Sequence, residues 1–281
     1  MRRGAGLFML CGLVLGVLAS QLVGSVFAQR QADSRLYDVL KRGHLVAGVS
    51  STAPPFGYRD EKGEVAGFDI DMARILAKTL FGDPGKVTFE VLAQDARWAA
   101  VQAGKVDVAM MATTIYPDRA QKVAFTRAYV DSGFAILVRK DSKLTTLEQV
   151  NDPKVKVASR TFPAQKARLA RYFPKAQPLF FDSPADQFLA VKSGRADALQ
   201  TDLPIVKWYA KTNPDVRSLG LFTNTANNGW FTRQGDFTWW LYLDTVVSEM
   251  LTGSLYDDYA DAYKKWFGDQ PPPQRFYQAA K

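Results

Sequence analysis

One short stretch of this sequence occurs twice, and the second copy lies 90 residues after the first. Residues 100–108 and 190–198 both begin with Ala-Val, and both place a glycine, a basic residue and an aspartate at matching positions. Gly104 and Gly194 each follow a helical pattern, where glycine is a preferred C-cap, and Asp107 and Asp197 each enter a strand. A repeat of this kind predicts two lobes with the same topology.

Each copy belongs to a run in which strands and helices alternate. In the first run we expect strands at residues 45–49, 87–92 and 106–111, with helices at 72–80 and 98–103. In the second run we expect strands at 154–158, 178–181 and 196–200, with helices at 164–172 and 186–192. This order predicts an α/β fold in which each lobe is a mostly parallel sheet flanked by helices.

The later segments indicate that the first lobe is discontinuous. Residues 237–265 carry aromatic and aliphatic side chains at helical spacing, and Gly253 divides them into two helices. Two segments, 134–138 and 221–232, are the expected crossovers between the lobes. We therefore expect lobe 1 to comprise residues 31–135 plus 230–281, and lobe 2 to comprise residues 136–229.

The first 28 residues have the pattern of a secretory signal peptide. Arg2 and Arg3 supply a positive start, residues 6–18 are almost wholly apolar, and a stretch of small residues ends at Ala28. The apolar stretch is shorter than the roughly 20 residues that span a membrane, which favours a cleaved signal over a permanent anchor. We expect removal of residues 1–28 and a mature protein in the periplasm.

Composition narrows the chemistry of the mature chain. Cys11, inside the signal, is the only cysteine and His44 the only histidine, so disulfides, thiol nucleophiles and cysteine- or histidine-rich metal sites are not expected. The net charge of the full 281-residue chain is +8, but the basic residues form no dense block and no nucleic-acid motif is present. We therefore expect no nucleic-acid partner, metal or cofactor. We also expect the protein to be a monomer.

Polar residues follow one strand in each of the two runs. The first strand end leads through Thr114 to Arg119, and the second ends near Asp202. Ligands bind beyond the carboxyl ends of strands in open parallel sheets, so these residues are candidates for a site between the lobes. An arginine for a carboxylate and an aspartate for an ammonium together suit a zwitterion.

Five segments, in order, give the chain a family resemblance. It resembles the family 3 bacterial extracellular solute-binding proteins, the amino-acid receptors of ABC importers, in the segments 54–58 (PPFGY), 67–78 (GFDIDMARILAK), 114–126, 194–202 and 265–268 (KWFG). The resemblance implies a two-lobed type II periplasmic binding protein with two crossover strands as its hinge. It also implies an amino-acid ligand that is delivered to the membrane subunits of an ABC transporter.

The resemblance further implies a role for each of six residues. Arg119 corresponds to the residue that holds the α-carboxylate, with help from the Thr114 hydroxyl, and Asp202 to the residue that holds the α-ammonium. Phe56 corresponds to a ring stacked over the ligand, and Thr161 to a further hydroxyl at a helix N-terminus. Arg97 stands where the glutamate/aspartate-binding branch has an arginine for the side-chain carboxylate.

Each role has a structural alternative. Arg119 and Arg97 fit solvated helix positions, Asp202 fits the N-cap of a helix beginning near residue 204, and Phe56 fits the core. In the 67–78 segment, the two aspartates at positions 69 and 71 are expected to cap and charge a helix N-terminus rather than to act as catalysts.

The second lobe departs from the family pattern at two neighbouring positions. Arg160 stands where the family usually has glycine, and Phe162 where a second hydroxyl is common. Arg160 together with Arg97 suits a dicarboxylic amino acid, which we take as a hypothesis.

Two other functions remain open on the same scaffold. Some relatives are cyclohexadienyl dehydratase-like enzymes, which need a positioned general acid. The carboxylates near the second-lobe strand end are only Asp197 and Asp202, so binding rather than catalysis is expected. A ligand-sensing module that acts on a separate receptor is the third possibility.

Overall fold

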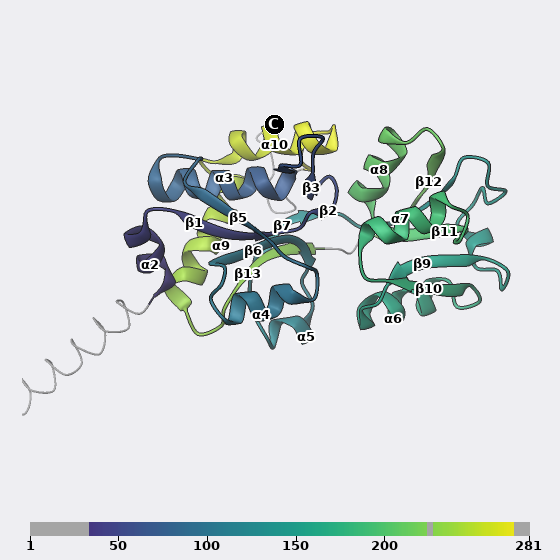
Figure 1. The fold of residues 1–281 in the computed structure, drawn as a ribbon, viewed down its shortest axis with the longest axis horizontal. Coiled ribbons are helices and arrows are strands. Elements are labelled where there is room, and N and C mark those ends of the chain that lie inside the picture. The colour runs from purple at the N-terminus through teal and green to yellow at the C-terminus, as the bar shows by residue number, and fades with distance from the viewer. Residues whose placement is uncertain (1–33, 224–226, 273–281) are drawn as a thin grey trace, which may run out of the picture.

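The computed structural model describes residues 34–223 and 227–272, which form two lobes side by side (Figure 1). The expected signal peptide, residues 1–28, lies outside the described residues. Within the described ranges, no helix combines the length and apolarity needed to cross a membrane. Each lobe is α/β and has its own five-stranded sheet, as the repeat predicts.

Lobe 1 contains a sheet with the strand order β5-β1-β6-β13-β7. β1 pairs in parallel with β5 and β6, and β13 lies antiparallel between β6 and β7. The elements are β1 (Leu45–Val49), β5 (Val87–Val91), β6 (Val108–Thr114), β7 (Ala124–Asp131), β13 (Asn227–Thr232), α2 (Arg35–Arg42), α3 (Phe68–Phe81), α4 (Ala96–Gln102), α5 (Pro117–Ala120), α9 (Phe237–Thr252) and α10 (Tyr256–Phe267).

Lobe 2 contains a sheet with the strand order β10-β9-β11-β8-β12. β9 pairs in parallel with β10 and β11, and β8 lies antiparallel between β11 and β12. The elements are β8 (Phe134–Arg139), β9 (Lys156–Arg160), β10 (Gln177–Phe181), β11 (Ala198–Asp202), β12 (Val216–Thr223), the 3-10 helix η1 (Glu148–Val150), α6 (Pro163–Tyr172), α7 (Pro184–Lys192) and α8 (Leu203–Thr212). Both sheets are therefore mixed, with three parallel strands each.

Alternate residues of a central strand enter cores on opposite faces of the sheet. In β6, Val108 and Met110 join the core beneath α3 and α9, whereas Ala109 and Met111 join the core beneath α4. Figure 1 shows the same layering, with α3 and α10 on one face of the lobe 1 sheet and α4 and α5 on the other. This period-two pattern fixes which strand residues end up buried on each side.

Two connections join the lobes: the first lies just before the expected segment 134–138, and the second lies within the expected segment 221–232. β7 leads into β8 through residues 132–133, and β12 leads to β13 through residues 224–226, which lie outside the described residues. β8 pairs with lobe 2 strands from Phe134, and β13 pairs with lobe 1 strands from Asn227. Backbone pairing therefore assigns 134–135 to lobe 2 and 227–229 to lobe 1, the reverse of the expectation from the sequence.

The repeated sequence forms the same local structure in both lobes. Asp107 accepts a hydrogen bond from the backbone N–H of Val46 at 2.7 Å, and Asp197 accepts one from the backbone N–H of Lys156 at 2.8 Å. The two glycines preceding them have φ of 70° and 77°. Each aspartate thus ties the strand it enters to the start of the neighbouring parallel strand, β1 or β9, which explains the match of residue types.

A third, small sheet extends lobe 1 next to lobe 2. It has the order β2-β3-β4, with β2 (Thr52–Ala53), β3 (Gly57–Arg59) and β4 (Val65–Ala66). Gly67 follows with φ 138° and acts as the N-cap of α3, without a capping side chain.

Candidate functional site

The carboxyl ends of the parallel strands of both lobes meet at the lobe junction. Arg119 on α5 follows β6 of lobe 1, and Phe162 follows β9 of lobe 2. The guanidinium carbon of Arg119 lies 5.6 Å from the centre of the Phe162 ring. Arg168 on α6 also donates a hydrogen bond across the junction, to the Tyr116 hydroxyl.

Arg119 is half-buried among aromatic rings. Its Nη1 donates to the carbonyl oxygen of Thr114 at 2.8 Å, and its guanidinium lies 4.9 Å from the Tyr116 ring and 5.8 Å from the Trp98 ring. Burial lowers its pKa, and the charges of Tyr116, Asp118 and Asp202 oppose that shift. Thr114 contacts Arg119 through its backbone carbonyl. The ligand contact of its hydroxyl stays a prediction.

Arg97 is buried next to Arg119 and is not the solvated residue of the alternative interpretation. Only 2% of its surface is exposed. Its Nη1 donates to Gln94 Oε1 at 2.6 Å and to Thr113 Oγ1 at 3.1 Å, but its Nε has no hydrogen-bond partner among the described residues. Burial, followed by the charges of Arg119 and Arg160, lowers the pKa of Arg97 to about 9.

Arg160 brings a second buried guanidinium from lobe 2. It is 5% exposed, lies 4.8 Å from the Phe162 ring, and donates from Nη2 to the carbonyl oxygen of Asp182. Its Nε, like that of Arg97, is buried without a partner in the described part of the chain. Burial lowers its pKa to about 10, against the opposing charges of several aspartates, Asp95 first.

Asp202 provides the negative group at the junction. It ends β11 and takes the N-cap position of α8, but its side chain makes no capping hydrogen bond. Instead, Ser132 Oγ in the connection between the lobes donates to its Oδ1 at 2.6 Å. Burial raises the pKa of Asp202, while Ser132, Arg168 and Asn228 oppose the rise.

Two residues of the expected site have other roles in this structure. The Phe56 ring is fully buried and packs 5.5 Å from the Phe267 ring and 6.5 Å from the Phe68 ring, so it belongs to the lobe 1 core. The Thr161 hydroxyl is exposed and lies 2.6 Å from Asp182 Oδ1, within its own lobe. We therefore place neither residue among the proposed ligand contacts.

Reasoning from the sequence did not select Tyr116 or Arg168 for the site. Tyr116 lies inside the strand-end segment 114–119, immediately before a proline that starts a helix. Its position in the sequence therefore already indicated that it lies near the site. Arg168 lies on a helix face, and only the packing of the lobes brings it to the junction.

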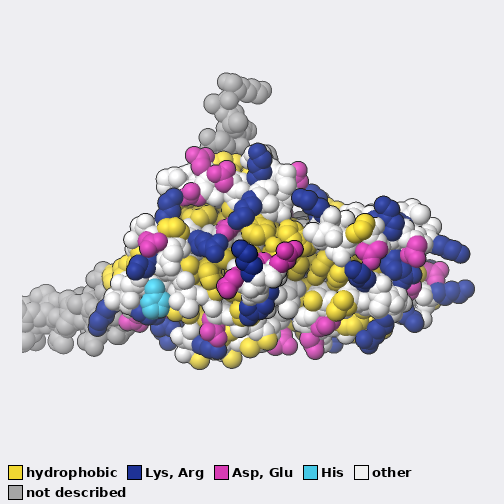
Figure 2. Space-filling model, turned by 45° about the horizontal axis from the view of Figure 1, so that its top comes forward, with side chains coloured by type: hydrophobic (Ala, Val, Ile, Leu, Met, Phe, Trp, Pro, Cys, Tyr) yellow, Lys and Arg dark blue, Asp and Glu magenta, His cyan; other side chains and the backbone are white. Residues whose placement is uncertain are grey.

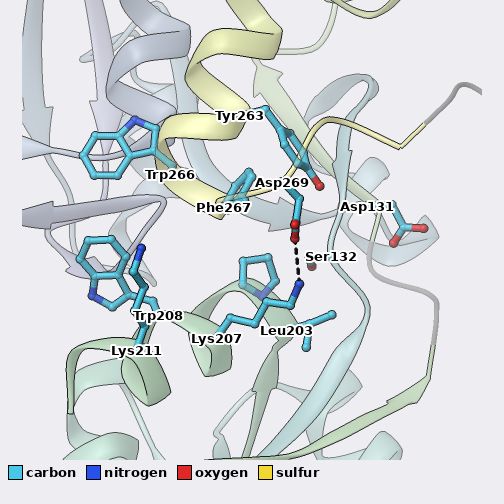
Figure 3. Close-up of a pocket in the computed structure, with 11 residues that line it drawn as sticks. Asp131, Ser132, Leu203, Lys207, Trp208, Lys211, Tyr263, Trp266, Phe267 and Asp269 are labelled. Carbon is cyan, nitrogen blue, oxygen red and sulfur yellow. Dashed lines mark hydrogen bonds and ion pairs between the residues drawn. The ribbon is translucent and has the colours of Figure 1, made fainter. Parts of the chain in front are cut away.

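A separate cavity of about 100 Å³ lies between the lobes at α8 and α10 (Figure 3). Trp208 and Lys207 of lobe 2 line it opposite Trp266 and Asp269 of lobe 1, and Figure 3 marks the 3.3 Å ion pair between Lys207 and Asp269. None of the junction arginines lines this cavity. Its walls combine aromatic rings with charged side chains, including that of Lys211.

No group of three or more histidine, cysteine, aspartate or glutamate residues within 34–223 and 227–272 is arranged to hold a metal ion. The junction contains guanidiniums, aromatic rings and several carboxylates, because Asp95 and Asp182 act on Arg160 in addition to Asp202.

Residues 45–269 match the family model of the bacterial extracellular solute-binding proteins, family 3. The chain belongs to this family. It is 30% identical over 229 residues to the ABC transporter glutamine-binding protein GlnH of Bacillus subtilis (strain 168), covering 81% of this chain and 82% of that one.

Solved structures of type II periplasmic amino-acid-binding proteins share the fold of this family 3 protein. The ancestral amino acid-binding protein AncCDT-1, a precursor of cyclohexadienyl dehydratase, is 36% identical with a TM-score of 0.74, and the match covers 83% of this chain and all of that one (100%). The cysteine-binding protein from Campylobacter jejuni is 27% identical with a TM-score of 0.73, covering 83% and 92%.

Proposed function

We propose that this family 3 protein captures an amino acid between its lobes and delivers it to the membrane subunits of an ABC transporter. The observation that carries the proposal is the placement of Arg119 and Asp202, which extend from matching strand ends of the two lobes toward one junction. The guanidinium is suited to an α-carboxylate, and the carboxylate to an α-ammonium. The names of its relatives, including glutamine- and cystine-binding proteins, support this ligand class.

Binding then couples to the relative position of the lobes. A ligand that contacts Arg119 of lobe 1 and Asp202 of lobe 2 favours whichever arrangement brings both residues into reach. Such a shift between open and closed forms provides the shape that a transporter recognises.

Calorimetry with the twenty common amino acids tests the proposal. We expect at least one to bind, and we expect R119A and D202A each to weaken its binding by about 100-fold, because each leaves a charged ligand group unpaired. The exposed residue Lys122 provides the control, since K122A removes a lobe 1 charge away from the described contacts. Full affinity in both R119A and D202A would refute the assignment of the site.

The periplasmic location, the monomeric state and the transporter partner are part of the proposal. The family description is extracellular, which supports export of the chain. We expect the mature N-terminus of protein recovered from a periplasmic fraction to follow Ala28, and the protein to elute as a monomer in size-exclusion chromatography. A mature chain that retains residues 1–28 contradicts the cleavage prediction.

Catalysis is the alternative function, because the similar protein AncCDT-1 is described as a precursor of cyclohexadienyl dehydratase. AncCDT-1 itself is described as an amino acid-binding protein, which favours binding here. Incubation with prephenate tests the alternative directly. We expect no phenylpyruvate, and its formation at a rate that D202A abolishes would favour the enzyme.

A further inference from the structure

The end of β6 departs from regular strand geometry at Ala112. Between its pairs with β13 at Ala109 and at Thr113, β6 contains residues 110–112 where β13 contains only residue 230, so β6 bulges. In the part of the chain that the structure describes, Ala112 is the only residue other than glycine with a positive φ, 44°. This conformation is unfavourable for alanine, and a bulge redirects the side chains that follow it.

The two residues after Ala112 each accept a hydrogen bond from an arginine at the lobe junction. Thr113 Oγ1 accepts from Arg97 at 3.1 Å, and the carbonyl oxygen of Thr114 accepts from Arg119 at 2.8 Å. The backbone of this segment therefore sets where both guanidiniums lie. A return of Ala112 to a negative φ would rotate the segment and displace both acceptors.

A buried carboxylate contacts the bulge at Ala112. Asp69 Oδ2 accepts a hydrogen bond from the Ala112 backbone N–H at 2.9 Å. The other carboxylate oxygen accepts one from the Tyr129 hydroxyl of β7, and the Asp69 backbone N–H donates to the Phe56 carbonyl oxygen at 2.8 Å. Contacts with two other segments thus fix Asp69, which presents a firmly held acceptor to the bulge.

Stability alone does not account for an aspartate at position 69. Asp69 has no exposed surface, and it takes part in no salt bridge within the described ranges. On the face drawn in Figure 2, by contrast, acidic side chains lie at the surface among basic ones. Burying a carboxyl group without a counter-charge is costly, and burial raises the pKa of Asp69 to about 7. The arrangement is explained if the carboxylate serves the strand end.

We propose that Asp69 is a positioning residue for amino-acid binding, because its hydrogen bond to Ala112 maintains the strained end of β6 and so keeps Arg97 and Arg119 in place. Asp69 acts through the backbone and does not contact the amino acid. Strained backbone persists only where surrounding contacts enforce it, and Asp69 provides that contact. This inference rests on the proposed amino-acid binding and adds a residue outside the lobe junction.

Three single variants test the inference. Calorimetry at about pH 8 uses the one of the twenty common amino acids that wild type binds most tightly. We expect D69A to bind it about tenfold more weakly, because Ala112 loses its acceptor. D69N should stay within about threefold of wild type, because the amide oxygen still accepts from Ala112. Y129F is the matched control, since it removes the other hydrogen bond of the same carboxylate, and it should also stay within about threefold.

A second substitution distinguishes positioning from general damage to the core. Glycine adopts a positive φ without the cost that alanine incurs, so it can keep the bulge without the carboxylate. We therefore expect D69A/A112G to recover most of the affinity that D69A loses. Urea unfolding identifies conditions in which each variant is folded, and binding is compared there.

The pH dependence of binding supplies a test that does not require D69A to fold. Near Asp69, β6 contributes only the Ala112 N–H, β7 contributes Tyr129, and α10 contributes Tyr259, whose hydroxyl donates to the Tyr129 carbonyl oxygen at 2.7 Å. Burial raises the pKa of both tyrosines, so both stay neutral near pH 7. Burial also raises the pKa of Asp202, but Asp202 titrates in wild type and in D69N alike.

Ionised Asp69 makes the stronger hydrogen bond to Ala112, since that bond is then charge-assisted. Wild-type affinity should therefore rise about threefold more than D69N affinity from about pH 5.5 to about pH 8. Calorimetry of both proteins with the same amino acid measures the difference.

The outcomes separate this inference from the proposed function. Equal affinity in D69A and wild type refutes the inference and leaves amino-acid binding intact. A loss in D69A that A112G does not restore, with the same pH response in D69N and wild type, assigns Asp69 to the core alone. If D69A does not fold, the pH comparison decides. Failure of wild type to bind any amino acid refutes the proposed function together with this inference.

Discussion

Asp69 illustrates how a motif residue can have a different role from the one its position suggests. The sequence predicts a helix-capping aspartate, but Gly67 takes the N-cap position and Asp69 is fully buried. Its carboxylate accepts hydrogen bonds from the Tyr129 hydroxyl and from the Ala112 backbone N–H, the latter at 2.9 Å. It therefore joins the start of α3 to β7 and to the end of β6, two residues before Thr114.

Burial of Asp69 predicts a pH-dependent stability. Burial raises its pKa from 3.8 to about 7, against the hydrogen bonds from Tyr129 and Ala112. The folded state therefore binds more protons than the unfolded state between these values, and its stability falls as the pH rises through this window. D69N lacks this titration. We expect the advantage of the wild type over D69N in free energy of unfolding to shrink by on the order of 3 kcal/mol between pH 4 and pH 8.

Urea unfolding of both proteins across this pH range measures the effect. Y129F removes the hydrogen-bond donor and leaves the carboxyl in place. Because that hydrogen bond lowers the pKa of Asp69, the pH dependence should persist in Y129F and extend to higher pH. A difference between wild type and D69N that stays constant from about pH 4 to about pH 8 contradicts the prediction.

At the scale of elements, the sequence predicts the helices and strands of the two repeated runs well. Their apolar periodicity is long enough to distinguish a helix from a strand, and the repeat confirms their order. The small β2-β3-β4 sheet is not predicted, because strands of two or three residues are too short to show an alternation of apolar and polar residues. The lobe boundaries differ from the expected ones by two or three residues, since an apolar run does not show which neighbours its backbone pairs with.

The start of α3 depends on a close approach of two backbone segments. A methyl group at Gly67 would lie 2.2 Å from the Phe56 carbonyl oxygen, and φ at this residue is 138°. We expect G67A to lose about 3 kcal/mol of stability in urea unfolding, from overpacking and backbone strain combined. G63A is the control, because Gly63 has φ 81° but open space around it, and it should lose only about 1 kcal/mol. Equal losses would exclude the close approach as the cause.

The site was predictable in part, for reasons visible at single positions. Arg119 and Asp202 follow strand ends, which the strand-end rule identifies without a structure. Phe56 lies in the core in this structure, and its sequence position alone could not decide between core and ligand, because an aromatic residue in a loop pattern fits either. Arg168 reaches the junction only through the packing of one lobe against the other.

At the scale of the whole molecule, aromatic contacts also hold the lobes together away from the arginines. The Trp208 ring of lobe 2 lies 5.3 Å from Tyr58 and 6.2 Å from Trp266, both of lobe 1. The ion pair of Lys207 with Asp269 nearby joins exposed side chains and contributes little. The aromatic cluster therefore contributes more to the contact between α8 and lobe 1 than this ion pair does.

Removing Trp208 should loosen this contact. We expect W208A to broaden the distribution of distances between spin labels on K122C in lobe 1 and K175C in lobe 2, because fewer contacts restrict the lobes. The labels attach selectively in the mature chain, whose only sequence cysteine, Cys11, lies within the predicted signal. K207A, which removes only the exposed ion pair, is the control. Distributions of equal width in W208A and wild type would show that the cluster does not restrain the lobes.

The gathered guanidiniums at the junction also bear on how quickly a ligand arrives. A concentration of one sign of charge between low-dielectric walls draws in oppositely charged solutes, and dissolved ions weaken that attraction. Stopped-flow association of an acidic ligand should therefore slow as sodium chloride is added, whereas dissociation changes less. The protein would then bind its ligand fastest at low ionic strength.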